Sequence, residues 1–292
     1  MERLGREAAS MREIHVDEIA RAVRELCLET NYVLGEDVRR AFTLAREREI
    51  SPLGRQVLEQ LLENIAIAGS DRVPMCQDTG TVVVFADVGQ DIHIVGGAFE
   101  DAIDRGVREA YSVGYLRKSM VERPFTARRN TRDNTPAIVH TRLVPGDRLR
   151  LAVLAKGGGA ENMSRLAMLT PADGRKGIER FVVETVELAG PNACPPVIVG
   201  VGIGGTFDSV GRLAKRALLR EIGSVNPDPE AAELEADLLR AVNRLGIGPQ
   251  GFGGRITALA VHVESFPCHI ASLPVAVNLQ CGPAARHRVV EL

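Results

Sequence analysis

A thiol, an amide and a carboxylate follow one another in the stretch PMCQDTG, which covers residues 74–80. Pro74 and Gly80 bound this turn, and the apolar run Thr81–Ala86 begins directly after it. A cysteine thiolate can bind a metal, and a carboxylate can exchange a proton with a bound ligand. Because functional side chains concentrate on loops held by rigid elements, we treat this turn as a candidate site.

Three cysteines share this kind of setting. Cys76, Cys194 and Cys281 each follow a regular element and are bordered by Pro or Gly, and Cys268 in FPCHIAS has part of that character. Cys27 instead lies on an apolar helical stripe, where a thiol packs as a small hydrophobic side chain. On local context alone, the loop cysteines fit four unrelated buried thiols as well as they fit a shared site.

Cysteine spacing excludes several metal sites. The chain has no C-x-x-C pair, so ferredoxin-like and zinc-ribbon patterns are absent. A zinc site made of Cys268, His269, Cys281 and His287 would match no common ligand spacing. Three widely separated loop cysteines suit a cubane iron–sulfur cluster with one iron that has no protein ligand. Such an iron can act as a Lewis acid on a substrate hydroxyl, which is hydration chemistry rather than electron transfer.

Two glycine-rich loops follow predicted strands. GVGIGG, residues 200–205, has the G-x-G-x-x-G spacing of a dinucleotide site. The acidic residue that should end a second strand is missing, because Glu221 ends a helix and another helix follows, so we expect no βαβ unit. This loop could still bind an anion on backbone N–H groups, and so could KGGGAEN, residues 156–162. An NAD(P)-dependent oxidoreductase that uses GVGIGG is the alternative function.

Hydrophobic periodicity predicts the elements that position these loops. Helices are expected over residues 16–29, 35–49, 51–70, 97–115, 177–190, 208–221 and 229–245. Strands are expected at Val82–Phe85 and over residues 196–202, 256–265 and 274–279. Ser51 and Asp228 are predicted N-caps because each precedes a proline that suits the first helical position. Residues 137–144 and 148–156 flank Pro-Gly-Asp and predict a β-hairpin.

These elements predict a mixed α/β (α+β) fold. We expect an N-terminal helical segment, residues 1–70, followed by an α/β cluster-binding catalytic region, residues 71–292. The two parts form one continuous domain, residues 1–292, because no linker separates them. The cluster-binding loops are expected at strand ends, between mixed sheets and their flanking helices.

The composition excludes several classes of protein. With 36 basic and 38 acidic side chains in 292 residues, the net charge of −2 gives no indication of nucleic-acid or membrane binding. Aromatic residues make up 4% and Trp is absent, which argues against base-stacking surfaces. No apolar run approaches the ~18 residues of a membrane span, and we recognise no signal-peptide pattern. Free cysteines without a secretory signal predict a cytoplasmic protein.

Six stretches, taken together, resemble the iron–sulfur (class I) fumarate hydratases and the related L-tartrate dehydratase alpha subunits. They are PMCQDTG, LRKSM, NTRDNTPA, KGGGAENMS, NACPPVIVGVGIGGTFD and PCHIASLPVAVNLQCGPAARH. The resemblance runs from about residue 15 to the C-terminus, and the motifs are long and ordered. It does not separate fumarate from tartrate or methylfumarate-type substrates.

The resemblance implies a [4Fe–4S] cluster as cofactor, with Cys76, Cys194 and Cys281 as its ligands. In the family, the aspartate of the CQDTG stretch handles the proton of the leaving hydroxyl, and the glutamine before it contacts substrate. Those residues are Asp78 and Gln77 here. Asp78 must be protonated for part of the cycle, because the departing oxygen needs a proton donor.

Further site residues follow from the same resemblance. Arg117, in the LRKS stretch, would grip a substrate carboxylate, and Gly158 and Gly159 would supply backbone contacts. His269 would face the substrate as a second catalytic residue, although a structural histidine is the alternative. Loss of a proton beside a carboxylate builds negative charge on that carboxylate, which Arg117, Lys156 and loop N–H groups can stabilise.

The resemblance also implies a partner chain. Single-chain members carry a further C-terminal domain of about 200 residues, which supplies the carbon base and more carboxylate-binding residues. This sequence ends at CGPAARHRVVEL, just past the last predicted cluster ligand. We therefore expect the alpha subunit of a hetero-oligomer whose beta subunit of about that size completes the active site.

The sequence thus predicts the alpha subunit of a two-chain iron–sulfur hydro-lyase. Its substrate would be a small 2-hydroxy dicarboxylic acid, with malate and fumarate slightly favoured over tartrate. Besides the oxidoreductase, the remaining alternative is a non-catalytic scaffold subunit whose cysteines only pack.

Overall fold

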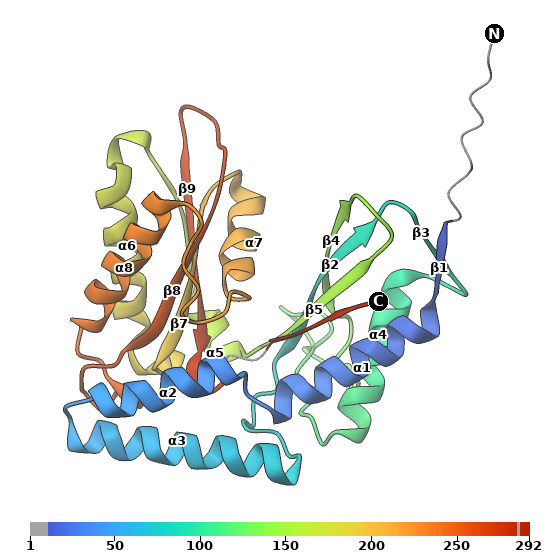
Figure 1. Cartoon of the computed structure of the whole chain (residues 1–292), viewed down its shortest axis with the longest axis horizontal. Coiled ribbons are helices and arrows are strands. Elements are labelled where there is room, and N and C mark those ends of the chain that lie inside the picture. Colours follow the sequence, from blue (N-terminus) through green and yellow to red (C-terminus); the bar gives the residue numbers. More distant parts are fainter. Residues whose placement is uncertain (1–10, 285–286) are drawn as a thin grey trace.

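Two four-stranded mixed sheets stand side by side above a layer of long helices (Figure 1). This arrangement comes from a computed structural model that describes residues 11–284 and 287–292. The mixed α/β class expected from the sequence is confirmed. The helices are α1 (Val16–Tyr32), α2 (Glu36–Arg48), α3 (Pro52–Asp71), α4 (Phe99–Val113), α5 (Gly158–Asn162), α6 (Gly174–Ala189), α7 (Phe207–Ala217) and α8 (Pro229–Asn243).

The strands are short to medium in length. They are β1 (Arg12–His15), β2 (Thr81–Gly89), β3 (Ile92–Val95), β4 (Ile138–Val144), β5 (Leu149–Lys156), β6 (Arg165–Leu169), β7 (Val197–Gly204), β8 (Ala258–Phe266), β9 (Leu273–Cys281) and β10 (His287–Glu291). β1 and β3 form a separate parallel pair. No helix within residues 11–284 and 287–292 is long and apolar enough to cross a membrane.

The first sheet has the order β10-β5-β2-β4. The hairpin predicted from residues 137–144 and 148–156 is wrong, because β2 lies between β4 and β5 and pairs with both. Most residues of β2 are buried, whereas β4 has no buried residue and suits the edge of the sheet. The Pro-Gly-Asp turn instead passes over the end of β2, where Gly89 N–H donates to Arg148 O at 2.9 Å.

The second sheet has the order β6-β9-β7-β8. α7 covers one face, while α6 and α8 cover the other (Figure 1). The expectation of no βαβ unit is wrong, because β7 and β8 are parallel neighbours joined through α7 and α8. A Cβ on Gly200 would lie 2.1 Å from Ala214 O, and one on Gly202 would lie 2.3 Å from Val210 O. These glycines therefore let α7 approach β7 closely.

The N-terminal helices pack on both sheets. α1 shares an apolar core with α4 and the first sheet, whereas α2 and α3 share another core with Ile198 and Ala260 of the second sheet. Both predicted N-caps are confirmed: Ser51 Oγ accepts Gly54 N–H at 3.2 Å, and Asp228 Oδ1 accepts Glu230 N–H at 3.0 Å. The first ten residues of the predicted segment 1–70 lie outside the described residues. The division at residue 70 stays a prediction, and these shared cores favour one continuous unit.

Glu49 anchors the helical layer to the second sheet. Its side chain is fully buried after α2 and accepts N–H groups of Ile50 and Ser51 from its own segment, at 2.8 and 2.9 Å. It also accepts N–H groups of Arg255 and Ile256, at 2.9 Å each. Burial opposes ionisation, but these backbone donors outweigh it and lower the pKa of Glu49.

Replacing Glu49 by Gln should destabilise the protein by about 2 kcal/mol, because an amide cannot accept all of these buried N–H groups. The folded pKa lies below the unfolded one of about 4.3, so the stabilisation is complete above that pH and lost as the pH falls through the folded pKa. Urea unfolding at about pH 7 and about pH 4 should show a smaller difference at the lower pH. Glu47→Gln, at an exposed position of α2, is the matched control. Equal midpoints for Glu49→Gln and the parent protein at neutral pH would contradict this role.

Candidate active site

Two of the three predicted cluster ligands meet at the end of the second sheet where β7 begins and β9 ends. Cys281 ends β9 and pairs in register with Val197, the first residue of β7. Cys194 stands three residues before Val197, in the left-handed conformation with φ 54° and ψ 63°. The Cys281 thiol hydrogen-bonds to Cys194 and lowers the pKa of Cys194 to about 6, against burial and the nearby charge of Asp78. A thiolate is the form that binds iron, so this pair favours metal binding.

The turn that carries Cys76 is held by three helices. Met75 N–H donates to Asn31 O at the end of α1, at 3.1 Å. Asn64 of α3 donates to Met75 O at 2.9 Å, and Tyr111 of α4 donates its hydroxyl to Thr79 O at 2.7 Å. The backbone around Cys76 is therefore fixed on both sides by buried or half-buried donors.

Asp78 lies where this turn meets the KGGG loop. Its Oδ1 accepts Gly80 N–H at 3.0 Å, and its Oδ2 accepts Gly158 N–H at 2.7 Å. Gly80 has φ 76°, and a Cβ there would lie 2.7 Å from the backbone of Lys156. Glycine is thus required for the turn to approach β5, and that approach orients the Asp78 carboxylate.

The KGGG loop also faces the loop of Cys194. A Cβ on Gly159 would be 3.5 Å from Asn192 O, two residues before that cysteine. Gln77 accepts a hydrogen bond from the Cys76 thiol at 3.4 Å. The structure therefore brings together the three cysteine loops, Gln77, Asp78 and the glycines of the KGGG loop.

Lys156 is placed differently from its expected role as a substrate contact. Its side chain is 1% exposed, and its Nζ lies 3.1 Å from Glu161 Oε2. Glu161 also accepts Lys215 Nζ of α7 at 2.5 Å and Asn278 Nδ2 of β9 at 2.8 Å. Burial lowers the pKa of Lys156 to about 8, and Glu161 opposes that shift. Burial alone would raise the pKa of Glu161, but both lysines hold it at about 2.

Sequence reasoning missed this polar network. Glu161 lies inside the KGGGAEN motif and Asn278 three residues before Cys281, so both were within the recognised stretches. Neither has a local pattern that reveals a partner, because each partner comes from a distant element. Asn134 was missed for the same reason: it donates to Gly80 O at 3.1 Å across 54 residues of chain.

Arg117 lies next to the Asp78 turn, at the point where the chain extends away from the rest of the protein. Its backbone oxygen accepts the hydroxyl of Thr79 at 2.9 Å, and its side chain is exposed. The guanidinium is therefore available to a carboxylate ligand near Asp78.

His269 is not brought to this site within one chain. It lies in the exposed loop between β8 and β9, at the opposite end of β9 from Cys281. β9 has nine residues, so its two ends are about 26 Å apart at ~3.3 Å per residue. The same separation divides Cys268 from Cys281, which removes the zinc site considered above. The catalytic role of His269 stays a prediction that one chain alone does not fulfil.

The GVGIGG stretch is not a loop, because residues 200–204 form the second half of β7 and are paired with β8 and β9. Only Gly205 lies beyond the strand, at the far end of the sheet from Cys281, and its N–H donates to Phe266 O at 3.2 Å. The helix that follows, α7, begins with a capping box in which the Thr206 and Ser209 side chains each accept the backbone N–H of the other residue. A phosphate at this helix start would need those same N–H groups. Since its glycines serve helix packing, the stretch gives no support to the oxidoreductase alternative.

The residues present fit an iron–sulfur cluster. None of the loop cysteines is buried: Cys194 and Cys268 are exposed, and Cys76 and Cys281 are half-buried. The reading as four buried packing thiols is therefore wrong, whereas Cys27 is buried as expected. No three His, Cys, Asp or Glu side chains in the described ranges cluster tightly enough for a single metal ion. Soft thiolates on separate loops are the type of ligand that iron–sulfur clusters use.

Replacing Glu161 by Gln should destabilise the chain by about 1–2 kcal/mol, because a partly exposed carboxylate then no longer neutralises two lysines. The low folded pKa means that this stabilisation is complete above about pH 4.3 and is lost as the pH falls toward 2. Loop displacement should also lower turnover about tenfold or more. Glu184→Gln, which breaks the exposed pair with Arg165, is the matched control and should change neither quantity. Unfolding curves that coincide for both variants would rule out the bridging role of Glu161.

Comparison with known proteins agrees with this geometry. Residues 20–291 match the sequence model of the fumarate hydratase (Fumerase) family. A Methanocaldococcus jannaschii protein named "Putative L(+)-tartrate dehydratase subunit alpha" is 43% identical over 269 residues, which cover 90% of this chain and 94% of that protein. The L(+)-tartrate dehydratase alpha subunits of Escherichia coli K12 and Shigella boydii are each 35% identical over 238 residues, covering 81% of this chain and 78% of theirs. The chain therefore belongs to the fumarate hydratase (Fumerase) family and is a hydro-lyase.

Proposed function

We propose that this chain is the alpha subunit of a two-chain iron–sulfur hydro-lyase that reversibly dehydrates a 2-hydroxy dicarboxylic acid. The observation that carries the proposal is the Asp78 carboxylate, fixed by Gly158 N–H at 2.7 Å beside the thiols of Cys194 and Cys281. The names of the relatives favour L(+)-tartrate to oxaloacetate as the first reaction to test, ahead of malate to fumarate.

Cys76, Cys194 and Cys281 would hold the [4Fe–4S] cluster. When bound, such a cluster supplies a Lewis acid for the substrate hydroxyl and carboxylate. Three thiolate ligands leave one iron without a protein ligand, which is the requirement for that chemistry.

The chain's own side chains would bind and protonate the substrate. Asp78 would give its proton to the departing hydroxyl oxygen, and its two backbone hydrogen bonds keep the carboxyl group aimed during turnover. The exposed guanidinium of Arg117 would bind one substrate carboxylate in a bidentate pair. Gln77 would hydrogen-bond to the substrate from the same turn as Asp78, and Lys156 would act through Glu161 and the KGGG loop rather than by contact.

A partner must complete this site. A diacid has a second carboxylate, and removal of a C–H proton needs a base, for which the gathered residues offer no second candidate. The relatives are named as alpha subunits, which supports a beta subunit, and we propose a chain of about 200 residues. His269 can join the site only from a second copy of this chain, because of the length of β9.

Anaerobic co-expression with the product of the neighbouring gene tests the proposal. The purified complex should contain iron and should dehydrate L(+)-tartrate or malate, and neither chain alone should be active. Cys194→Ser should lose both iron and activity, because one cluster ligand is gone. Cys27→Ser, at a buried position of α1, is the control and should keep both.

Two outcomes would contradict the proposal. Full iron content in Cys194→Ser protein would remove that cysteine from the ligand set. Full activity of the cluster-loaded chain by itself would remove the need for a partner.

Asp78→Asn should lower turnover by roughly 10²–10⁴-fold, because an amide has no proton to give to the hydroxyl. Iron content should stay the same, since Asp78 is not a ligand, and anaerobic iron analysis beside the rate assay checks both statements. Asp91→Asn, an exposed carboxylate in the turn after β2, is the control. If the Asp78 variant turns over at the parent rate, the proton donor is another group.

A further inference from the structure

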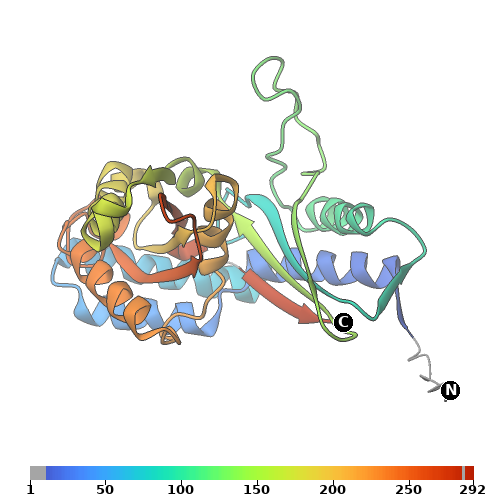
Figure 2. The same ribbon diagram turned by 90° about the horizontal axis from the view of Figure 1, so that it is seen from above.

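An arm formed by residues 117–133 projects from the body between α4 and β4 (Figure 2, green). Residues 122–130 of this arm are all exposed. A bridge between Val121 and Asn130 and the bond from Thr131 N–H to Met120 O, at 3.0 Å, hold its two strands together. The arm therefore has a defined shape although no other element covers it.

The arm carries a concentrated positive charge. It contains six basic residues and two acidic ones, so its net charge is +4 in a chain whose net charge is −2. The basic residues are Arg117, Lys118, Arg123, Arg128, Arg129 and Arg132. None of them forms an ion pair with any residue that the structure describes. The acidic Asp133 is already paired with Arg108 of α4, at 3.0 Å.

Phe125 stands at the tip with 91% of its surface exposed. Arg123 and Arg128 on either side of it adopt positive φ, at 46° and 43°, which is unfavourable for a side chain that nothing packs against. Exposed aromatic and arginine side chains are the residue types that dominate protein interfaces. The arm thus has the composition of a docking element.

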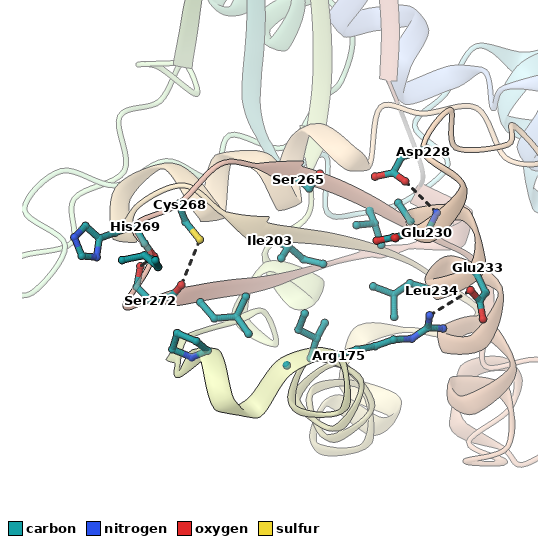
Figure 3. A pocket seen from close by; sticks show the side chains of 17 residues that line it. Arg175, Ile203, Asp228, Glu230, Glu233, Leu234, Ser265, Cys268, His269 and Ser272 are labelled. Atoms are coloured by element: carbon teal, nitrogen blue, oxygen red, sulfur yellow. Dashed lines mark hydrogen bonds and ion pairs between the residues drawn. The ribbon is translucent and has the colours of Figure 1, made fainter.

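A pocket with the opposite charge lies in the second sheet region. Its volume is about 700 Å³, between α6, α8 and the β8–β9 loop (Figure 3). The lining includes the apolar side chains of Ile178, Ile203, Leu234 and Ile270. Three carboxylates also line the pocket: Asp228, Glu230 and Glu233. The lining includes one arginine, Arg175, which already forms ion pairs with Glu179, Glu233 and Asp237.

The pocket cannot be a subsite of the candidate active site in the same chain. It includes His269 and Leu273, at the start of β9, whereas Cys281 ends that strand. The arm begins and ends beside the Asp78 turn, because Arg117 O accepts the Thr79 hydroxyl and Asn134 donates to Gly80 O. Arm and pocket therefore lie at separate places on one chain and can meet only between two chains.

We infer that the arm of one copy docks into this acidic, apolar pocket of a second copy, with Phe125 inside it and Arg128 and Arg129 against Glu230 and Glu233. Charge complementarity carries the pairing, and the apolar pocket offers burial to a phenylalanine that is otherwise exposed. Exchange of the two arms closes a two-fold dimer with two identical contacts. This inference concerns assembly and does not depend on the proposed reaction.

A charge-swap experiment on the full chain tests this contact. Light scattering should find a dimer for the parent protein. Phe125→Ala should weaken the dimer about tenfold or more, and the arm variant Arg128→Glu/Arg129→Glu should be monomeric. The pocket variant Glu230→Arg/Glu233→Arg should also be monomeric. A mixture of the arm and pocket variants should restore a one-to-one dimer, because both contacts in it are then complementary.

Two controls match the variants in chemistry. Phe207→Ala removes another phenylalanine, 69% exposed at the start of α7, and Arg39→Glu/Arg40→Glu reverses another adjacent basic pair on α2. Both should remain dimers. A parent protein that is monomeric, arm variants that dimerise normally, or a mixture that stays monomeric would each overturn the inference. It is equally overturned if the arm variants lose only the beta chain and keep the alpha dimer, since the arm would then dock on the partner.

Discussion

Glu161 joins the two sheets at the place where the predicted cluster ligands converge. Its carboxylate bonds Lys156 of β5 in the first sheet, and Lys215 of α7 and Asn278 of β9 in the second. Burying a charge in this position costs free energy unless the charge is paired, so the two lysines and the carboxylate must stay in contact. Their contact therefore fixes the relative positions of the elements that carry them. The KGGG loop starts at Lys156 and leads to Glu161, and its Gly158 N–H orients Asp78. The geometry of the site therefore depends on this junction.

The sequence predicted elements where a signal was local, and failed where partners were distant. Helix caps at Ser51 and Asp228 were correct because the cap side chain and the N–H group that donates to it lie within three residues of each other. The hairpin of β4 and β5 was wrong because β2, which precedes both, inserts between them. A turn sequence shows that the chain reverses direction there, but it does not show whether a strand from earlier in the chain lies between the two.

The same distinction separates the candidate site residues. The motifs identified the cysteine loops, Gln77 and Asp78, and the structure gathers them. Lys156 was recognised as important, but its burial against Glu161 could not be known, since Glu161 also needs α7 and β9 to be in place. His269 shows the converse, because a long shared motif with Cys281 spans both ends of one strand. Residues of one motif are close in sequence, but they need not be close in space. An extended strand separates His269 from Cys281 by a large distance although they are only twelve positions apart in the sequence.

Net charge was uninformative for a related reason. A total of −2 is a sum over surfaces that face different partners, and it conceals an arm of +4 and a pocket rimmed by carboxylates. The pocket lies at the other end of β9 from the buried network around Glu161, where charges are already paired. The arm starts beside that network but extends into solvent. When a positive patch and a negative patch lie at different places on one molecule, association of two molecules can bring the opposite charges into contact and so lower the electrostatic energy. The chain thus pairs the charges of its buried network internally, whereas the basic residues of the arm form no ion pair with any described residue and lie where another chain can reach them.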